Sequence, residues 1–288
     1  MKKHSFYIAG GDMRSVYLAN ALAADEYNVK VYGLSEGLME GVSVSEDIGE
    51  AVACDTVILP LPCSDNYGRI RAIKEEEKVP LLRLVERLRG GTAIIGGIVP
   101  EEVKEIAKKR NIAVFDYYER EEFTVRNASL TAEAAVALAL DMLKESINDM
   151  PVLILGHGRI GRLLTAMLKA LDAEVTVAAR RFSDLAWIRS EGAKPLEFSR
   201  LGGEIEKFGL IFNTVPALVL NEEMLQKADK NVLIIDLASE PGGTDFAAAE
   251  KLGITAKKAL GLPGKFAPKT AGEILHDTVL NILSETEE

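Results

Sequence analysis

The stretch VLILGHGRIGRLL, residues 152–164, decides the fold of this chain. It begins as an apolar strand and ends as a helix, and Gly156, Gly158 and Gly161 lie between them in G-x-G-x-x-G order. The first glycine permits a tight turn, the second a close backbone approach to a pyrophosphate, and the third close packing of helix on strand. The alternative is a turn with incidental glycines. We predict a dinucleotide at the helix N-terminus, bound by Gly156, Gly158, Arg159, Ile160 and Gly161.

The end of the next predicted strand selects the nucleotide. NAD-binding proteins usually place an Asp or Glu there for the ribose 2′-hydroxyl, but VTVAARRFSD (175–184) has Ala179 or Arg180 at that position. Guanidinium groups bind a 2′-phosphate that a carboxylate would repel. The sequence therefore predicts NADP rather than NAD, held by Arg180, Arg181 and Ser183. The alternative is that one arginine only stacks on the adenine.

Strands and helices alternate along the whole chain, which predicts an α/β fold of two Rossmann-like, doubly wound parallel-sheet domains. We expect a flavodoxin-like substrate domain at 1–127 and an NADP-binding domain at 128–288. A buried helix (127–146), capped by Ser129 or Thr131, would join them. A final helix, in which Thr270 and Glu273 form a capping box, would pack back on the first domain over 268–288. The expected strands are 6–9, 29–32, 56–61, 93–96, 112–115, 152–155, 174–178, 210–213, 232–237 and 254–256, with helices at 14–24, 70–74 and 101–109.

Two later strand ends should complete the nucleotide site, because ligands bind at the carboxyl ends of parallel strands. Asn213 and Thr214 have the alternative role of a plain turn cap. Asp236, inside an apolar strand, more simply satisfies backbone N–H groups. His157 should face solvent or the pyrophosphate. The predicted nicotinamide-side contacts are Asn213, Thr214, Val215, Pro216, Ala238 and Ser239.

The composition limits the class of protein. The formal net charge is -10 with dispersed acids, so there is no broad basic surface for nucleic acid. No apolar run reaches the roughly 18 residues of a membrane span, and the N-terminus lacks the long apolar region of a secretory signal. Two cysteines, and no metal-ligand spacing of His, Asp or Glu, predict neither a disulfide scaffold nor a metal site. We expect a cytoplasmic protein without a metal.

The first strand ends in AGGDMRS (9–15), a second glycine turn. It has no third glycine in register, and Asp12 stands where phosphates would sit, which argues against a second dinucleotide. Arg14, near a helix N-terminus, suits a carboxylate ligand. Ser64 follows another strand end on the same side.

Four motifs carry a family resemblance: GGDMR (10–14), LGHGRIGR (155–162), DLASEPGGTDF (236–246) and GLPGKFAPKTAGEIL (261–275). With them the chain resembles the family of dipicolinate synthase A subunits found in endospore-forming bacteria. Weaker similarity extends to alanine and 2-hydroxyacid dehydrogenases. The resemblance implies NADP-dependent oxidation of a dihydrodipicolinate-type intermediate to dipicolinate (pyridine-2,6-dicarboxylate). It also implies a flavoprotein-like partner, the B subunit, with the mother-cell cytoplasm during sporulation as location; a homo-oligomer is left open.

A small ring with two carboxylates needs basic or N–H-rich anchors. We expect Arg14, Ser64 and Arg126 to bind it, with donors from Thr270 and Ala271 at a helix N-terminus. Arg126 has the alternative of pairing with an acid of YYEREEF (117–123).

The proton released on oxidation would go to Asp12, Lys269 or water. Asp12 has the alternative of capping its own helix, and Lys269 that of being solvated. Two rival functions stay open: a dehydrogenase of another 2-hydroxy or 2-amino acid, and a regulatory or scaffold protein that binds NADP but leaves the chemistry to its partner.

Overall fold

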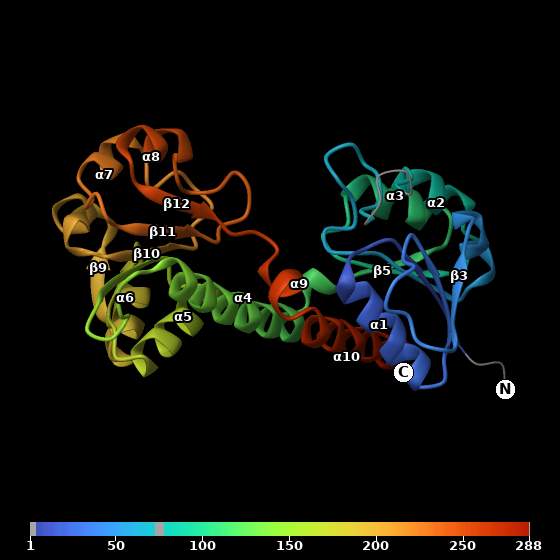
Figure 1. Ribbon diagram of the computed structural model, residues 1–288. Coiled ribbons are helices and arrows are strands. Elements are labelled where there is room, and N and C mark those ends of the chain that lie inside the picture. Colours follow the sequence, from blue (N-terminus) through green and yellow to red (C-terminus); the bar gives the residue numbers. More distant parts are fainter. Residues whose placement is uncertain (1–3, 73–77, 288) are drawn as a thin grey trace. The chain divides into compact units, whose positions relative to one another are not determined.

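The computed structural model describes residues 4–72 and 78–287 (Figure 1). The chain divides into two compact units. Unit 1 comprises Met1–Asn127 and Ala267–Glu288, and unit 2 comprises Ala128–Phe266. None of the helices in the described ranges is long and apolar enough to cross a membrane.

Unit 1 contains a six-stranded parallel sheet in the order β3-β2-β1-β4-β5-β6. Its central strand β1 is buried along its whole length, as in a sheet covered on both faces. The strands are β1 (Ser5–Ala9), β2 (Asn28–Tyr32), β3 (Val42–Ser45), β4 (Thr56–Ile58), β5 (Ala93–Gly96) and β6 (Ala113–Asp116). The helices are α1 (Met13–Ala24), α2 (Leu81–Arg87), α3 (Glu101–Lys109) and α10 (Pro268–Glu287), with short 3-10 helices at Ile48–Ala53 and Tyr117–Glu119.

Unit 2 repeats this topology with six parallel strands in the order β12-β11-β10-β7-β8-β9. In both sheets the first strand of the unit lies between its second and its fourth, so the order reverses beside the turn after β1 or β7. The strands are β7 (Pro151–Leu155), β8 (Glu174–Ala179), β9 (Lys194–Glu197), β10 (Leu210–Asn213), β11 (Leu233–Asp236) and β12 (Thr255–Lys258). The helices are α5 (Arg159–Ala170), α6 (Phe182–Ser190), α7 (Glu222–Gln226), α8 (Phe246–Leu252) and α9 (Leu262–Phe266), with 3-10 helices at Phe198–Gly203 and Ile205–Lys207.

These two sheets confirm the predicted fold class, but two strands and the helices α2 and α6 to α9 had no predicted range. Strands β3 and β9 are edge strands with the mixed sequences VSVS and KPLE, which lack the apolar run of a buried strand. The helix predicted at 70–74 is wrong at its start, because Ile70 forms an antiparallel bridge with Ser64. Residues 73 and 74 lie outside the described ranges, as do residues 1–3 of the N-terminal segment.

The long helix α4 (Glu121–Met142) contributes its first residues to unit 1 and the rest to unit 2. The predicted caps Ser129 and Thr131 are wrong, because both lie inside this helix. The helix begins instead at Glu121 and Glu122, whose charges favour the N-terminal end of the helix dipole.

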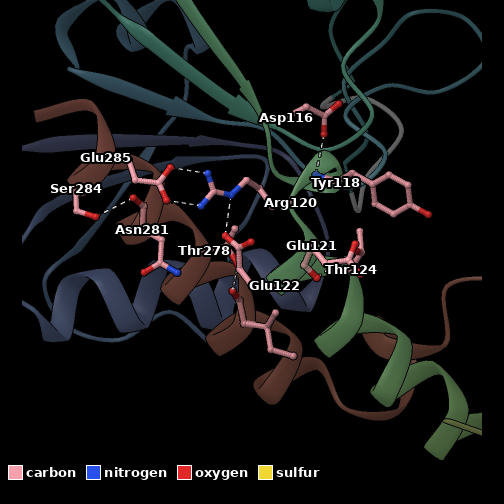
Figure 2. Close-up of polar contacts among 11 residues, drawn as sticks. Asp116, Tyr118, Arg120, Glu121, Glu122, Thr124, Thr278, Asn281, Ser284 and Glu285 are labelled. Atoms are coloured by element: carbon pink, nitrogen blue, oxygen red, sulfur yellow. Dashed lines mark hydrogen bonds and ion pairs between the residues drawn. The ribbon is translucent and has the colours of Figure 1, made fainter. Parts of the chain in front are cut away.

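Helix α10 lies against α1 within unit 1. Gly272 permits this approach, since a Cβ there would lie 2.5 Å from the Tyr17 Cβ. The start of α10 corrects the predicted capping box. The helix begins at Pro268, a residue favoured in a first helical turn, so Thr270 is not its N-cap. Arg120 holds the far end of α10 through two hydrogen bonds of 2.6 Å to the Glu285 carboxylate (Figure 2).

Candidate functional site

The glycine turn after β7 is built as its spacing predicts. Gly156 has a φ of +97°, and a Cβ there would lie 2.5 Å from the Thr214 Oγ1. A Cβ on Gly161 would lie 2.2 Å from the Gly156 carbonyl oxygen. Both positions therefore require glycine, the first for its backbone conformation and the second for the contact between turn and helix.

The middle glycine differs, because nothing fills the space beside it. Gly158 is the N-cap residue of α5 and supplies no side-chain cap, and a Cβ there would meet no atom within 4 Å. The first N–H groups of a helix have no partner inside the helix, and the helix dipole makes that end positive. The N-terminus of α5 is therefore an open place for an anion, next to the Arg159 and Ile160 backbone.

Two arginines follow β8, the neighbouring strand. β8 ends at Ala179, so Arg180 is the first residue beyond it, where a ribose-binding acid would stand. Arg180, Arg181 and Ser183 are exposed, and neither guanidinium group makes an ion pair or hydrogen bond with any described residue. Both guanidinium groups are thus available for a ligand anion.

The ends of β10 and β11 are held together by a buried amide–carboxylate pair. The Asn213 side chain donates to the Asp236 Oδ1 (3.0 Å) and to the Val215 carbonyl (3.1 Å). Asp236 also accepts the N–H groups of Ala238 (3.0 Å) and Gly243 (3.1 Å). This confirms the structural interpretation of Asp236.

The same pair favours the alternative role given for Asn213, that of a turn cap. Its side chain is fully buried, and its Oδ1 accepts the Val215 N–H at 3.1 Å. The Thr214 hydroxyl is likewise engaged, since it donates to the Leu155 carbonyl at 2.8 Å. Pro216 and Ser239 are exposed on the same loops, whereas Ala238 is buried and Val215 half-buried.

His157 contradicts the expectation that it faces solvent or the pyrophosphate. Only 3% of its side chain is exposed, and Nε2 lies 2.9 Å from the Glu191 Oε2. The sequence contained no local signal for this pair, because Glu191 lies 34 positions away.

In unit 1 the first glycine turn is filled by the protein itself. The Arg71 carbonyl accepts the Gly11 N–H at 2.7 Å, and a Cβ on Gly10 would lie 2.2 Å from that oxygen. A Cβ on Gly11 would lie 2.0 Å from the Ser15 Oγ. This space, occupied by a carbonyl and a hydroxyl, supports the prediction that no second dinucleotide binds here.

Asp12 and Arg14 form one unit at the start of α1. Asp12 is the N-cap residue and accepts the Arg14 N–H at 3.0 Å, while the guanidinium forks its carboxylate at 2.8–3.1 Å. Burial raises the pKa of Asp12, but these bonds to Arg14 outweigh it and leave the pKa below its ordinary value. A carboxyl group with a lowered pKa is a weak base, which argues against Asp12 as a proton acceptor.

Arg14 is itself held in place. Its side chain is only 12% exposed, and Nη2 also donates to the Leu61 carbonyl at 3.1 Å. Ser64 follows β4, as Leu61 does, and its carbonyl accepts a hydrogen bond from the Arg71 Nε. The neighbouring Cys63 thiol is buried, which raises its pKa to about 11, so it stays protonated at neutral pH. Sequence reasoning missed the nearby Tyr117, a fully buried ring whose hydroxyl donates to the Leu59 carbonyl.

The remaining predicted anchors are less suited to their roles. Arg126 does not pair with an acid of 117–123; its partner is Asp277 of α10, at 2.7 Å. Lys269 is solvated, with 73% of its side chain exposed. The prediction that Ala271 offers a free N–H is wrong, because this N–H donates to the Ala267 carbonyl. Thr270 is exposed and lies inside the first turn of the helix.

Other features do not compete with the turn after β7. A cavity of about 820 Å³ in unit 2 is lined by Pro151, Glu174 and Lys194 at the amino ends of the strands. Ligands of open parallel sheets bind at the carboxyl ends, so we place the site at the glycine turn. Within the described residues, no group of three or more His, Cys, Asp or Glu side chains could hold a metal ion.

Comparison with known proteins places the chain in a family. The model of the N-terminal domain of the dipicolinate synthase A subunit matches residues 5–118. The A subunit of dipicolinate synthase from Bacillus subtilis (strain 168) is 32% identical over 282 residues, which cover 96% of this chain and 95% of that protein. The crystal structure of the corresponding Bacillus halodurans protein superposes with a TM-score of 0.88 at 31% identity, over 98% of this chain and 99% of that one. L-Alanine dehydrogenase shares the fold alone, with a TM-score of 0.65 at 13% identity, over 96% and 88% of the two chains. The chain belongs to the family of dipicolinate synthase A subunits.

Proposed function

We propose that this chain is an NADP-dependent oxidoreductase that converts a dihydrodipicolinate-type intermediate to dipicolinate. The observation that carries the proposal is the open, uncapped turn at Gly158, beside two arginines whose guanidinium groups have no partner among the described residues. The family supplies the substrate class, since its relatives are named for dipicolinate synthesis.

The residues at the site fit NADP. Gly158 leaves room for the pyrophosphate, and the first turn of α5 offers N–H donors and a positive dipole end. Arg180 and Arg181 would hold the 2′-phosphate through charge-assisted hydrogen bonds, and Ser183 could add a hydroxyl. No acid at the end of β8 repels that phosphate.

The reaction balances with the nucleotide as the only oxidant. Held by the N-terminus of α5, Arg180 and Arg181, NADP⁺ would supply the oxidant for the one hydride that a ring carbon of the substrate loses. The ring also loses one proton, to water, and becomes an aromatic pyridine. Aromatisation supplies much of the driving force, so the protein mainly has to hold the ring in position and exclude competing geometries.

Arg14 is the best anchor for a substrate carboxylate. Asp12 and the Leu61 carbonyl fix its guanidinium, and within the described chain Nη1 makes no hydrogen bond. A pre-oriented arginine loses little conformational entropy when it binds an anion. Asp12 then acts as the positioning residue of Arg14, and Ser64 is a further candidate contact.

The relatives are named as A subunits, which supports a partner protein for this chain. We expect the partner to be a flavoprotein-like B subunit. The expected location is the mother-cell cytoplasm during sporulation. In the rival scaffold function, this chain would bind NADP and the partner would carry out the chemistry.

The test supplies a dihydrodipicolinate precursor and NADP to the purified chain and follows NADPH absorbance. We expect NADPH to form with the chain alone, in amounts equal to the dipicolinate produced. If NADP binds but NADPH appears only after the B subunit is added, the scaffold function replaces the proposal. If calorimetry detects no nucleotide binding, the proposal fails.

A further inference from the structure

The side chain of His157 turns away from the open side of the glycine turn and into the protein. It is 3% exposed and lies 2.9 Å from the Glu191 carboxylate. Glu191 is the C-cap residue of α6, the helix that begins directly after Arg180 and Arg181. One hydrogen bond therefore connects the turn after β7 with the C-terminal end of the helix that follows both arginines.

Three basic side chains contact Glu191. Besides His157, Arg162 of α5 donates to its Oε1 at 3.0 Å and 2.7 Å, and the Lys169 Nζ donates to its backbone carbonyl. Arg162 also stacks on the Trp187 ring of α6, with its Cζ 5.7 Å from the ring centroid. These contacts join the turn, α5 and α6 through a single residue.

The same contacts determine the ionisation of Glu191. Burial raises the pKa of Glu191, but the bonds from His157 and Arg162 outweigh this and leave the pKa lowered. An ionised carboxylate only accepts, so the His157 Nε2 must carry the hydrogen. The imidazole is thus held in one orientation by a charged partner.

We propose that the His157–Glu191 pair positions the glycine turn for the pyrophosphate of the dinucleotide. His157 stands between the two glycines whose backbone must approach that group, and these glycines have no side chains to hold the turn. The imidazole is the only side chain of Gly156–Gly158, and its bond to Glu191 fixes the backbone beneath the ligand. The inference rests on the proposed function, because it assumes that a dinucleotide binds this turn.

Two ligand fragments separate positioning of the turn from general stability. ADP-ribose carries the pyrophosphate without a 2′-phosphate, and 2′-AMP carries the 2′-phosphate without a pyrophosphate. For His157→Ala we expect about tenfold weaker ADP-ribose binding, the loss of one useful hydrogen bond. Binding of 2′-AMP should change less than about twofold, since Arg180 and Arg181 stay in place. Calorimetry on the full chain measures both.

Four further variants complete the test. His157→Gln keeps a donor for Glu191 and should restore ADP-ribose affinity to within about threefold of wild type. Glu191→Ala removes this bond together with those from Arg162, so it should weaken ADP-ribose at least as much as His157→Ala, and adding His157→Ala to it should weaken binding no further. Ser190→Ala is the control: it removes a hydrogen bond of α6 to the Trp187 carbonyl that involves neither His157 nor Glu191, and it should leave both affinities unchanged.

Equal losses for both fragments together with a lower melting temperature would reduce the pair to a structural role and overturn the inference. Unchanged ADP-ribose affinity in His157→Ala would also overturn it. A wild-type chain that binds neither fragment would instead refute the proposed function itself.

Discussion

The two units have the same strand order but opposite chemistry at their first turn. In unit 1 the N-cap of α1 is Asp12, whose carboxylate accepts a backbone N–H of the helix. In unit 2 the N-cap of α5 is Gly158, which leaves the helix end uncapped. The fold offers the same anion site twice, and unit 1 fills its own with a side chain. Topology alone therefore says little about which unit binds a nucleotide.

The difference lies at the N-cap position. The first glycine of each turn is closely packed, Gly10 against the Arg71 carbonyl and Gly156 against the Thr214 hydroxyl, whereas a Cβ on Gly158 would meet open space. Both turns contain glycines that close packing requires. Only the turn of unit 2 also has a glycine, Gly158, whose missing side chain leaves open space. Such a glycine is best explained by a ligand. Five predictions break or sharpen this comparison, from the largest expected effect to the smallest.

Gly161→Ala should break unit 2. Its Cβ would lie 2.2 Å from a backbone oxygen of the turn, which cannot move aside cheaply. We expect a loss of about 3 kcal/mol in the free energy of unfolding and no measurable NADP binding. Fluorescence of Trp187, the single tryptophan, reports unfolding of unit 2. Stability within about 0.5 kcal/mol of wild type would contradict the close contact.

Gly158→Asp should convert the unit 2 turn to the unit 1 design. The backbone at Gly158 is extended, with a φ of -83°, and its surroundings are empty, so an aspartate fits. The new cap should raise stability by a few tenths to about 1 kcal/mol. Repulsion of the pyrophosphate should weaken NADP by about a hundredfold. Gly158→Ala is the control, and calorimetry with urea unfolding measures both quantities; unchanged NADP affinity would place the phosphates elsewhere.

The double variant Arg180→Ala, Arg181→Ala should lose NADP selectivity. Removing charge-assisted bonds to the 2′-phosphate should weaken NADP by about thirtyfold or more, and NAD by less than about threefold. Both side chains are exposed, so folding should be unaffected. Titrations with the two nucleotides measure the effect. Equal losses would show that the arginines do not bind the 2′-phosphate.

Asp12→Asn should remove a part of the pH dependence of the stability of unit 1. Because the folded-state pKa of Asp12 is lowered, its contribution is complete above the ordinary value of 3.8 and is lost as the pH falls through the folded-state pKa. The stability of wild type over Asp12→Asn should therefore shrink as the pH drops below 3.8. Hydrogen exchange of the α1 amides measures this. A difference that stays constant with pH would show that the carboxylate is not stabilised in the fold.

Arg126→Ala should have the smallest effect. Arg126 and Asp277 are 46% and 50% exposed, and an exposed ion pair contributes about 0–1 kcal/mol. Because Asp277 already binds the Arg126 guanidinium, we expect Arg126→Ala to leave the substrate KM unchanged. Arg14→Ala should raise that KM clearly. Steady-state kinetics would check this. A raised KM for Arg126→Ala would return Arg126 to the substrate site.

Local sequence patterns determined the fold class and predicted the candidate nucleotide site. The glycine spacing at 156–161 and the missing acid after Ala179 act within a few residues, so they can be interpreted without knowing what packs nearby. The helix starts were predicted less well. Glu121 and Pro268 begin helices upstream of the Ser and Thr residues that resemble caps, because several residues can cap a helix and packing selects among them.

Only the tertiary structure decided which side chains meet. The Arg71 carbonyl closes the unit 1 turn, Asn213 faces Asp236, and His157 turns inward to Glu191, each across a long separation in sequence. Such partners depend on where the chain returns, and a residue type alone does not specify that. The sequence by itself thus predicted an anion site at the second glycine turn and none at the first, while the folded chain decided which distant groups pack against each turn.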